Sequence, residues 1–135
     1  MPGQGLAHDI QVYSEWIATA LGSSGYRVDF TPASAREIER FLAESAVAGT
    51  PVPGGLLAED TGARLFATGA YVGELIRRTA GGSWVVDDAD PQGEINVELH
   101  LPDGSVVWPV QRVLKRFHGD ASESIAVYVD TLTAA

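Results

Sequence analysis

Apolar residues recur along the chain at two different spacings, which predict where helices and strands form. Recurrence every three to four positions marks one apolar face of a helix, and recurrence every second position marks a half-buried strand. The helical spacing predicts five helices, over residues 8–21, from 31 or 34 to about 48, over 61–78, over 110–117 and over 125–132. The helix over 61–78 is the most apolar of the five, and Ala-Gly-Gly ends it.

Three short runs after the 61–78 helix are predicted as strands. They cover residues 83–88, 94–101 and 105–110, and the last two are joined across Pro-Asp-Gly, a turn sequence that accommodates positive φ angles. Together they predict a small antiparallel sheet. Residues 26–30 also alternate between apolar and polar positions, which is typical of a short strand or of an extended linker.

The order of these elements predicts an α+β fold, with a small antiparallel sheet of about three strands covered by helices. A sheet with one apolar face needs such a cover. The length of 135 residues fits a single domain, residues 1–135. We expect residues 1–7 to be flexible. Residues 49–60 contain two prolines and three glycines and are predicted to form a crossing loop that leans on the core.

Charge and composition exclude several classes of function. The formal net charge is −9, which would repel a nucleic-acid backbone. The absence of cysteine excludes disulfides, thiolate catalysis and cysteine-ligated metals. No segment approaches the roughly 20 apolar residues of a membrane span, and the first residues lack the features of a signal peptide. We therefore expect a cytoplasmic protein that binds neither nucleic acid nor membrane.

Motifs for cofactors and metals are absent or incomplete. The sequence has no P-loop, no dinucleotide-binding glycine fingerprint and no nucleophile elbow. The acidic segment from Asp88 resembles the first half of a calcium-binding EF-hand loop, but its twelfth position is Leu99 where a bidentate glutamate is needed. We interpret the segment as a solvated acidic turn and expect neither a cofactor nor a metal site.

The candidate site residues belong to the 61–78 helix and to the strand that follows it. Glu74 and Arg78 stand four residues apart, in the order that favours an ion pair, and Tyr71 lies three residues before Glu74. Gly69 and Gly73 weaken a helix, which indicates that a neighbouring element packs closely on them. A structural salt bridge explains Glu74 without chemistry. A pocket that uses Tyr71, Glu74 and Trp84 is the alternative.

The segment from 61 to 86 resembles small uncharacterised bacterial domains that carry a Gly-x-Tyr-x-Gly-Glu helix followed by a Gly-Gly-x-Trp strand. The matching positions are Gly69, Tyr71, Gly73, Glu74, Gly81, Gly82 and Trp84. The resemblance implies a fold but no established activity, and it therefore supplies no catalytic residues. The alanine- and glycine-rich composition of the chain is also similar to that of actinobacterial proteins.

These observations predict a non-enzymatic bacterial protein-binding domain, of the adaptor or immunity-inhibitor type. The binding candidates are Tyr71, Glu74, Arg78 and Trp84. The alternative is a small-molecule binding or enzymatic domain with a pocket between the 61–78 helix and the sheet. The sequence indicates neither the partner nor the oligomeric state.

Overall fold

The computed structural model describes residues 5–119 and 124–134. The α-helices in this part of the chain are α1 (Leu6–Ser23), α2 (Ala35–Ser45), α3 (Thr61–Ala80), α4 (Pro109–Phe117) and α5 (Ile125–Thr133). The strands are β1 (Ala46–Val47), β2 (Thr50–Pro51), β3 (Ser83–Val85), β4 (Glu98–His100) and β5 (Val106–Val107). Two short 3₁₀ helices, η1 (Pro32–Ser34) and η2 (Leu56–Ala58), precede α2 and α3.

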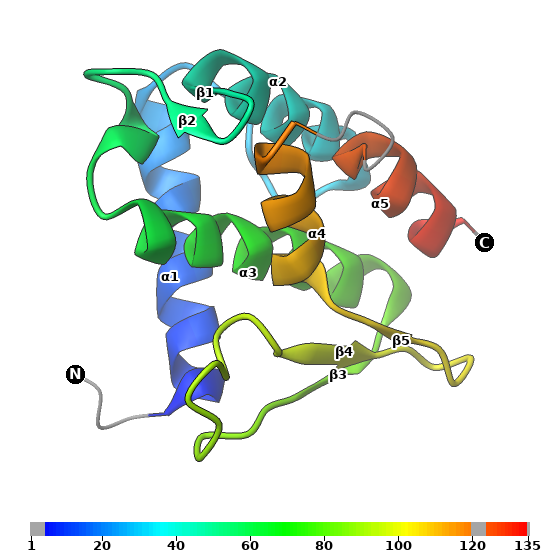
Figure 1. Cartoon of the computed structure of the whole chain (residues 1–135). Coiled ribbons are helices and arrows are strands. Elements are labelled where there is room, and N and C mark those ends of the chain that lie inside the picture. The colour runs from blue at the N-terminus through cyan, green and yellow to red at the C-terminus, as the bar shows by residue number, and fades with distance from the viewer. Residues whose placement is uncertain (1–4, 120–123, 135) are drawn as a thin grey trace.

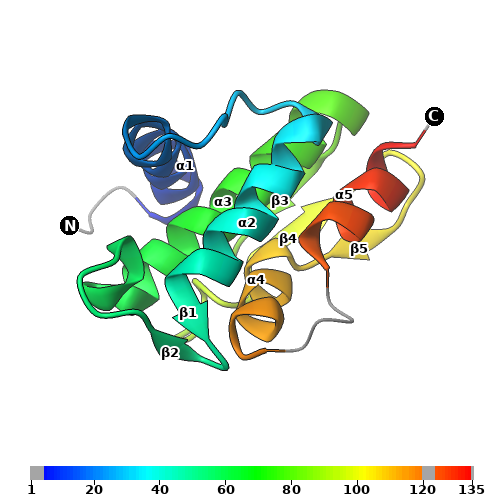
Figure 2. The same ribbon diagram turned by 90° about the horizontal axis from the view of Figure 1, so that it is seen from above.

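Helix α3 runs through the middle of the molecule, and the other elements pack around it (Figure 1). Every residue from Leu65 to Ile76 is buried, which explains why this segment is apolar on more than one face. Helix α1 lies on one side of α3, while α2 and α5 lie side by side on the opposite side (Figure 2). The α+β fold with a small sheet packed against helices is as predicted.

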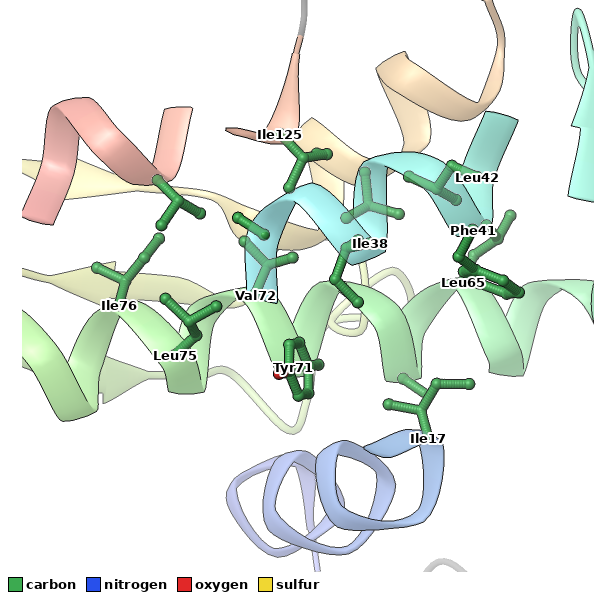
Figure 3. Packing of buried hydrophobic residues seen from close by; sticks show 14 of the residues in the cluster. Ile17, Ile38, Phe41, Leu42, Leu65, Tyr71, Val72, Leu75, Ile76 and Ile125 are labelled. Carbon is green, nitrogen blue, oxygen red and sulfur yellow. The ribbon is translucent and has the colours of Figure 1, made fainter. Parts of the chain in front are cut away.

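The core is built from contacts between α3 and its neighbours on both sides. Figure 3 shows Ile17 of α1 on one side of α3, and Ile38 and Phe41 of α2 on the other. These side chains have at most 1% of their surface exposed. Burying a large apolar side chain contributes about 1.5–3 kcal/mol, so these contacts dominate the stability of the fold.

Strands β3, β4 and β5 form an antiparallel sheet in that order, which confirms the predicted three-stranded meander. Leu99 in the central strand pairs with Trp84 on one side and Val107 on the other, and it is completely buried. The predicted third strand, over residues 105–110, included Trp108. Instead, Trp108 lies after β5 at the start of α4 and is 41% exposed.

A second, two-stranded sheet was not predicted. Strands β1 and β2 pair in antiparallel fashion around Ala48 and Gly49, both of which have positive φ angles. Ala48 is an unusual residue for such a turn, so no hairpin was predicted at this position. Strand β2 and helix η2 occupy part of the predicted crossing loop at 49–60, and Leu57 in η2 is completely buried.

Residues 26–30 are not a strand, and the linker interpretation is the correct one. Tyr26, Val28 and Phe30 turn toward the core, as the alternation predicted, but no strand pairs with the segment. The linker ends at Phe30, whose φ angle of 61° is incompatible with a strand. The alternating burial of residues 26–30 therefore comes from an unpaired segment that crosses the surface of the core.

The ends of some predicted elements shift. Helix α2 ends at Ser45, about three residues earlier than expected, because the chain turns into β1. Of the segment expected to be flexible, residues 1–4 lie outside the described residues, whereas Leu6 already belongs to α1. Within residues 5–119 and 124–134, no helix is both long enough and apolar enough to span a membrane.

Candidate functional site

Glu74 of α3 lies at the centre of the predicted site and has no exposed surface. Arg77 holds its carboxylate with two hydrogen bonds, from Nε to Oε2 at 2.7 Å and from Nη2 to Oε1 at 3.0 Å. The indole Nε1 of Trp84 donates to Oε2 at 2.7 Å, and Arg78 Nε lies 3.4 Å from Oε1. Helix α3 and strand β3 together supply all of these donors.

The surroundings of Glu74 keep it ionised. Burial alone would raise its pKa, but the hydrogen bonds from Arg77 and Trp84 and the charge of Arg77 lower the pKa to about 2. The carboxylate is therefore fully charged near neutral pH and fully engaged by donors. A general acid or base needs a pKa near the working pH and access to a substrate, and Glu74 has neither.

The space between α3 and the sheet at Gly73 is filled by the Trp84 ring. A Cβ atom added at Gly73 would lie 2.1 Å from Cη2 of Trp84. A Cβ at Gly69 would lie 2.6 Å from the Cα of Val110 in α4. Both glycines are thus present because a neighbour packs directly on the helix backbone, as the sequence predicted. The indole occupies the position where the alternative interpretation placed a pocket.

Tyr71 belongs to a different contact from Glu74. Its hydroxyl accepts a hydrogen bond from the backbone N–H of Phe30 at 2.9 Å and shares another with Ser34 at 2.7 Å. Its ring packs on the ring of Phe30, with centroids 4.5 Å apart. The guanidinium of Arg78 covers the Phe30 ring at 3.8 Å. Tyr71 and Arg78 therefore hold Phe30 in its left-handed conformation.

The four predicted residues thus join neighbouring elements of the fold. Glu74, Arg78 and Trp84 come together, and Tyr71 is linked to them only through Phe30 and Arg78. Arg77 was not predicted, although its spacing of three residues from Glu74 was a usable signal. We assign this cluster a structural role that fastens α3 to β3 and to the linker before α2.

A half-buried carboxylate, Glu39 of α2, was also not predicted. It accepts hydrogen bonds from the backbone N–H groups of Ile125 at 2.6 Å and Ala126 at 3.2 Å, and from the Ser124 hydroxyl at 3.0 Å. Arg116 of α4 pairs with its other oxygen. Burial would raise the pKa of Glu39, but these donors lower it. Glu39 thus caps the N-terminus of α5 from another helix.

The acidic turn after β3 uses its carboxylates as local caps. Asp88 accepts a hydrogen bond from the backbone N–H of Leu6 at 2.7 Å, which fixes the start of α1. Asp90 accepts from the Gln92 N–H and from the Asn96 side chain. Within the described part of the chain, no group of three or more acidic or histidine side chains is placed to hold a metal ion.

An exposed hollow lies between α1 and the start of α3. It has a volume of about 510 Å³ and is lined by Val12, Tyr13, Trp16, Asp60, Ala63 and Arg64. Val12 is 47% exposed and Trp16 is 41% exposed. Tyr13 forms one wall and packs edge-on against the buried Phe66. We call this feature the α1–α3 hollow.

The sequence contained a signal for this hollow. The buried face of α1 includes Ile10 and Ile17. Val12 and Trp16 are four residues apart and lie off that face, so they form a second apolar stripe on the same helix. A second stripe on a helix that is already packed along its first one indicates a surface that another molecule can cover.

Comparison of the chain with protein-family models, with curated proteins and with solved structures finds no match.

Proposed function

We propose that the chain is a bacterial protein-binding domain without catalytic activity, of the adaptor or immunity-inhibitor type, and that the α1–α3 hollow is its binding surface. Under this proposal the protein acts in the cytoplasm by holding a partner. The partner would cover Val12 and Trp16 and remove their apolar surface from water.

The exposure of Trp16 beside Val12 is the observation that carries the proposal. An indole that remains 41% exposed at a hollow is available for burial by a partner. Tryptophan, tyrosine and arginine are the residues most enriched at the energetic centres of protein interfaces, and Trp16, Tyr13 and Arg64 line this hollow. Trp108, Tyr128 and Arg112 line a smaller hollow beside β5 and α4, so the comparison of Trp16→Ala with Trp108→Ala decides between the two surfaces. The chemistry of the lining therefore suits a protein partner.

The hydrogen bonds of Glu74 and Glu39 also support a binding function. Glu74 and Glu39 each accept several hydrogen bonds, and both join elements of the fold. An active site would instead need an acid, base or nucleophile that faces a cavity. In the α1–α3 hollow, the charged groups of Asp60 and Arg64 stand beside the apolar surface of Val12, Trp16 and Ala63. A few polar groups around an apolar surface are typical of a binding site.

Affinity capture from host cells with three forms of the protein tests this proposal. The forms are the wild type, Trp16→Ala and Trp108→Ala, and both tryptophans are 41% exposed, so the second variant is a matched control on another face. Removing an aromatic residue at the centre of an interface costs about 2 kcal/mol or more, which is roughly a thirtyfold loss of affinity. Thermal melts would confirm that both variants fold.

We expect a protein that is captured by the wild type and by Trp108→Ala but lost with Trp16→Ala. Equal capture by Trp16→Ala would contradict the assignment of the α1–α3 hollow. Capture of no protein, together with a small molecule retained through purification, would instead favour the small-molecule alternative.

A further inference from the structure

One carboxylate without a partner, Asp60, lines the α1–α3 hollow, and two more acidic residues stand next to lining residues in the sequence. Glu59 precedes Asp60 in the chain, and Glu15 precedes Trp16 on α1. Among the described residues, none of these three side chains takes part in a hydrogen bond or an ion pair. Elsewhere on the surface, Glu37 and Glu44 both pair with Arg40. The negative charge of Asp60 at this hollow is therefore not paired with a described cation.

Asp60 occupies the N-cap position of α3 but does not act as a cap. Aspartate at this position usually accepts a hydrogen bond from the first turn of the helix. Here the residue adopts a left-handed conformation, with a φ angle of 48°, and its side chain makes no cap hydrogen bond. The carboxylate lines the α1–α3 hollow and remains open to another donor.

Arg64 does not neutralise Asp60, although both line the hollow. Its guanidinium donates to the carbonyl oxygen of Leu56 and lies 5.4 Å from the centre of the Trp16 ring. No ion pair joins Arg64 to Asp60 among the described residues. Arg64 therefore packs over the Trp16 ring and does not pair with the carboxylate of Asp60.

Resting on the binding function proposed above, we propose that the partner presents a basic, amphipathic protein segment to the α1–α3 hollow. An apolar side chain of the segment enters against Val12 and Trp16, and a neighbouring lysine or arginine pairs with Asp60. The net charge of −9 favours the approach of such a segment at long range, and the unpaired Asp60 fixes its position at short range.

The test uses two synthetic peptides, an amphipathic helix built of leucine and lysine and a matched helix built of leucine and glutamate. Binding is followed by the backbone amide shifts of isotope-labelled protein, for the wild type, Trp16→Ala, Asp60→Asn and Asp130→Asn. Asparagine tolerates the left-handed conformation of residue 60, so Asp60→Asn removes only the charge. Asp130→Asn makes the same charge change on α5, where Asp130 pairs with Arg36.

We expect the leucine–lysine peptide to shift amides around Val12, Trp16 and Asp60. Asp60→Asn should weaken this binding about fivefold, and Asp130→Asn should leave it within about twofold. Equal or tighter binding of the leucine–glutamate peptide, no binding of the leucine–lysine peptide, or no effect of Asp60→Asn would overturn the inference. If Trp16→Ala still abolishes binding when Asp60→Asn has no effect, only the inference about charge fails. If neither variant matters, the binding surface itself is wrong.

Discussion

At the scale of single residues, Gly73, Glu74 and Trp84 act as one unit. The absence of a side chain at Gly73 lets the Trp84 ring lie against α3, and this position brings its indole nitrogen to Glu74. The sequence predicted close packing on Gly73 and a paired Glu74. It did not indicate that Trp84 satisfies both requirements, because that contact depends on how β3 returns over α3.

Gly73→Ala should destabilise the fold by about 1–3 kcal/mol, because the new methyl group must displace the Trp84 ring. Gly62→Ala is the matched control in the same helix. Nothing lies within 4 Å of its added Cβ, so this substitution should stabilise the protein by up to about 1 kcal/mol. Urea unfolding of both variants measures the two effects. A Gly73→Ala protein as stable as the wild type would show that the ring does not pack as described.

Glu74→Gln should cost about 2–3 kcal/mol near neutral pH, more than expected for a partly exposed ion pair, because Glu74 is completely buried. An amide keeps the shape, but it cannot accept hydrogen bonds at both ends. The measurement is the free energy of unfolding in urea. Loss of stability below about 0.5 kcal/mol would contradict the structural role assigned to the cluster.

The difference in unfolding free energy between the wild type and Glu74→Gln should depend on pH. The folded state lowers the pKa of Glu74 from 4.5 to about 2, so the carboxylate contributes about 3 kcal/mol above the unfolded pKa. This contribution is lost as the pH falls through the folded pKa. The difference in stability between the wild type and Glu74→Gln should therefore shrink from pH 5 toward pH 2. A difference that stays constant over this range would contradict the lowered pKa.

At the scale of elements, patterns within one helix were easier to predict than contacts between elements. The spacing of apolar residues located α1 to α5 because each helix buries a continuous stripe. For residues 26–30 the pattern left a strand and a linker open, because a linker that crosses the core also buries every second residue; the structure shows the linker. Glu39 caps α5 by accepting a hydrogen bond from Ile125, which lies 86 positions later in the sequence. No local sequence pattern encodes such a contact.

Glu39→Ala should loosen α5 selectively. The substitution removes the acceptor for the first N–H groups of α5 and leaves Arg116 without its partner, at a cost of about 2 kcal/mol. Amide hydrogen exchange should accelerate most in α5 and least in α1. Glu44→Ala, on the exposed side of the same helix, should change stability by less than about 1 kcal/mol. Uniform acceleration across all helices would argue against a specific cap.

At the scale of the whole molecule, the acidic surface is the property that composition predicted most directly. The net charge of −9 could be read from the sequence, but the pairing of individual carboxylates could not, since it depends on which side chains meet in the fold. The structure distinguishes acids that fasten elements, such as Glu74 and Asp88, from acids that pair with no described residue, such as Asp60 in the α1–α3 hollow. The unpaired Asp60 is the basis of the inference that the partner is basic.

Millimolar calcium should leave the melting temperature unchanged, because Asp88 accepts a hydrogen bond from the start of α1 and Asp90 accepts one within the turn. An ion that bound the native state would raise the melting temperature by mass action. Magnesium at equal ionic strength is the control. A rise specific to calcium would contradict the interpretation of this segment as a structural turn.

The central claim is that a protein partner covers the α1–α3 hollow, and a hydrogen-exchange footprint of the captured complex tests it most directly. The comparison is between the free protein and the same protein bound to the partner that it retains from host cells. We predict slower exchange at residues 10–17 and 57–66, and unchanged exchange at residues 106–117. Protection confined to residues 106–117, with residues 10–17 exchanging as in the free protein, would contradict the account.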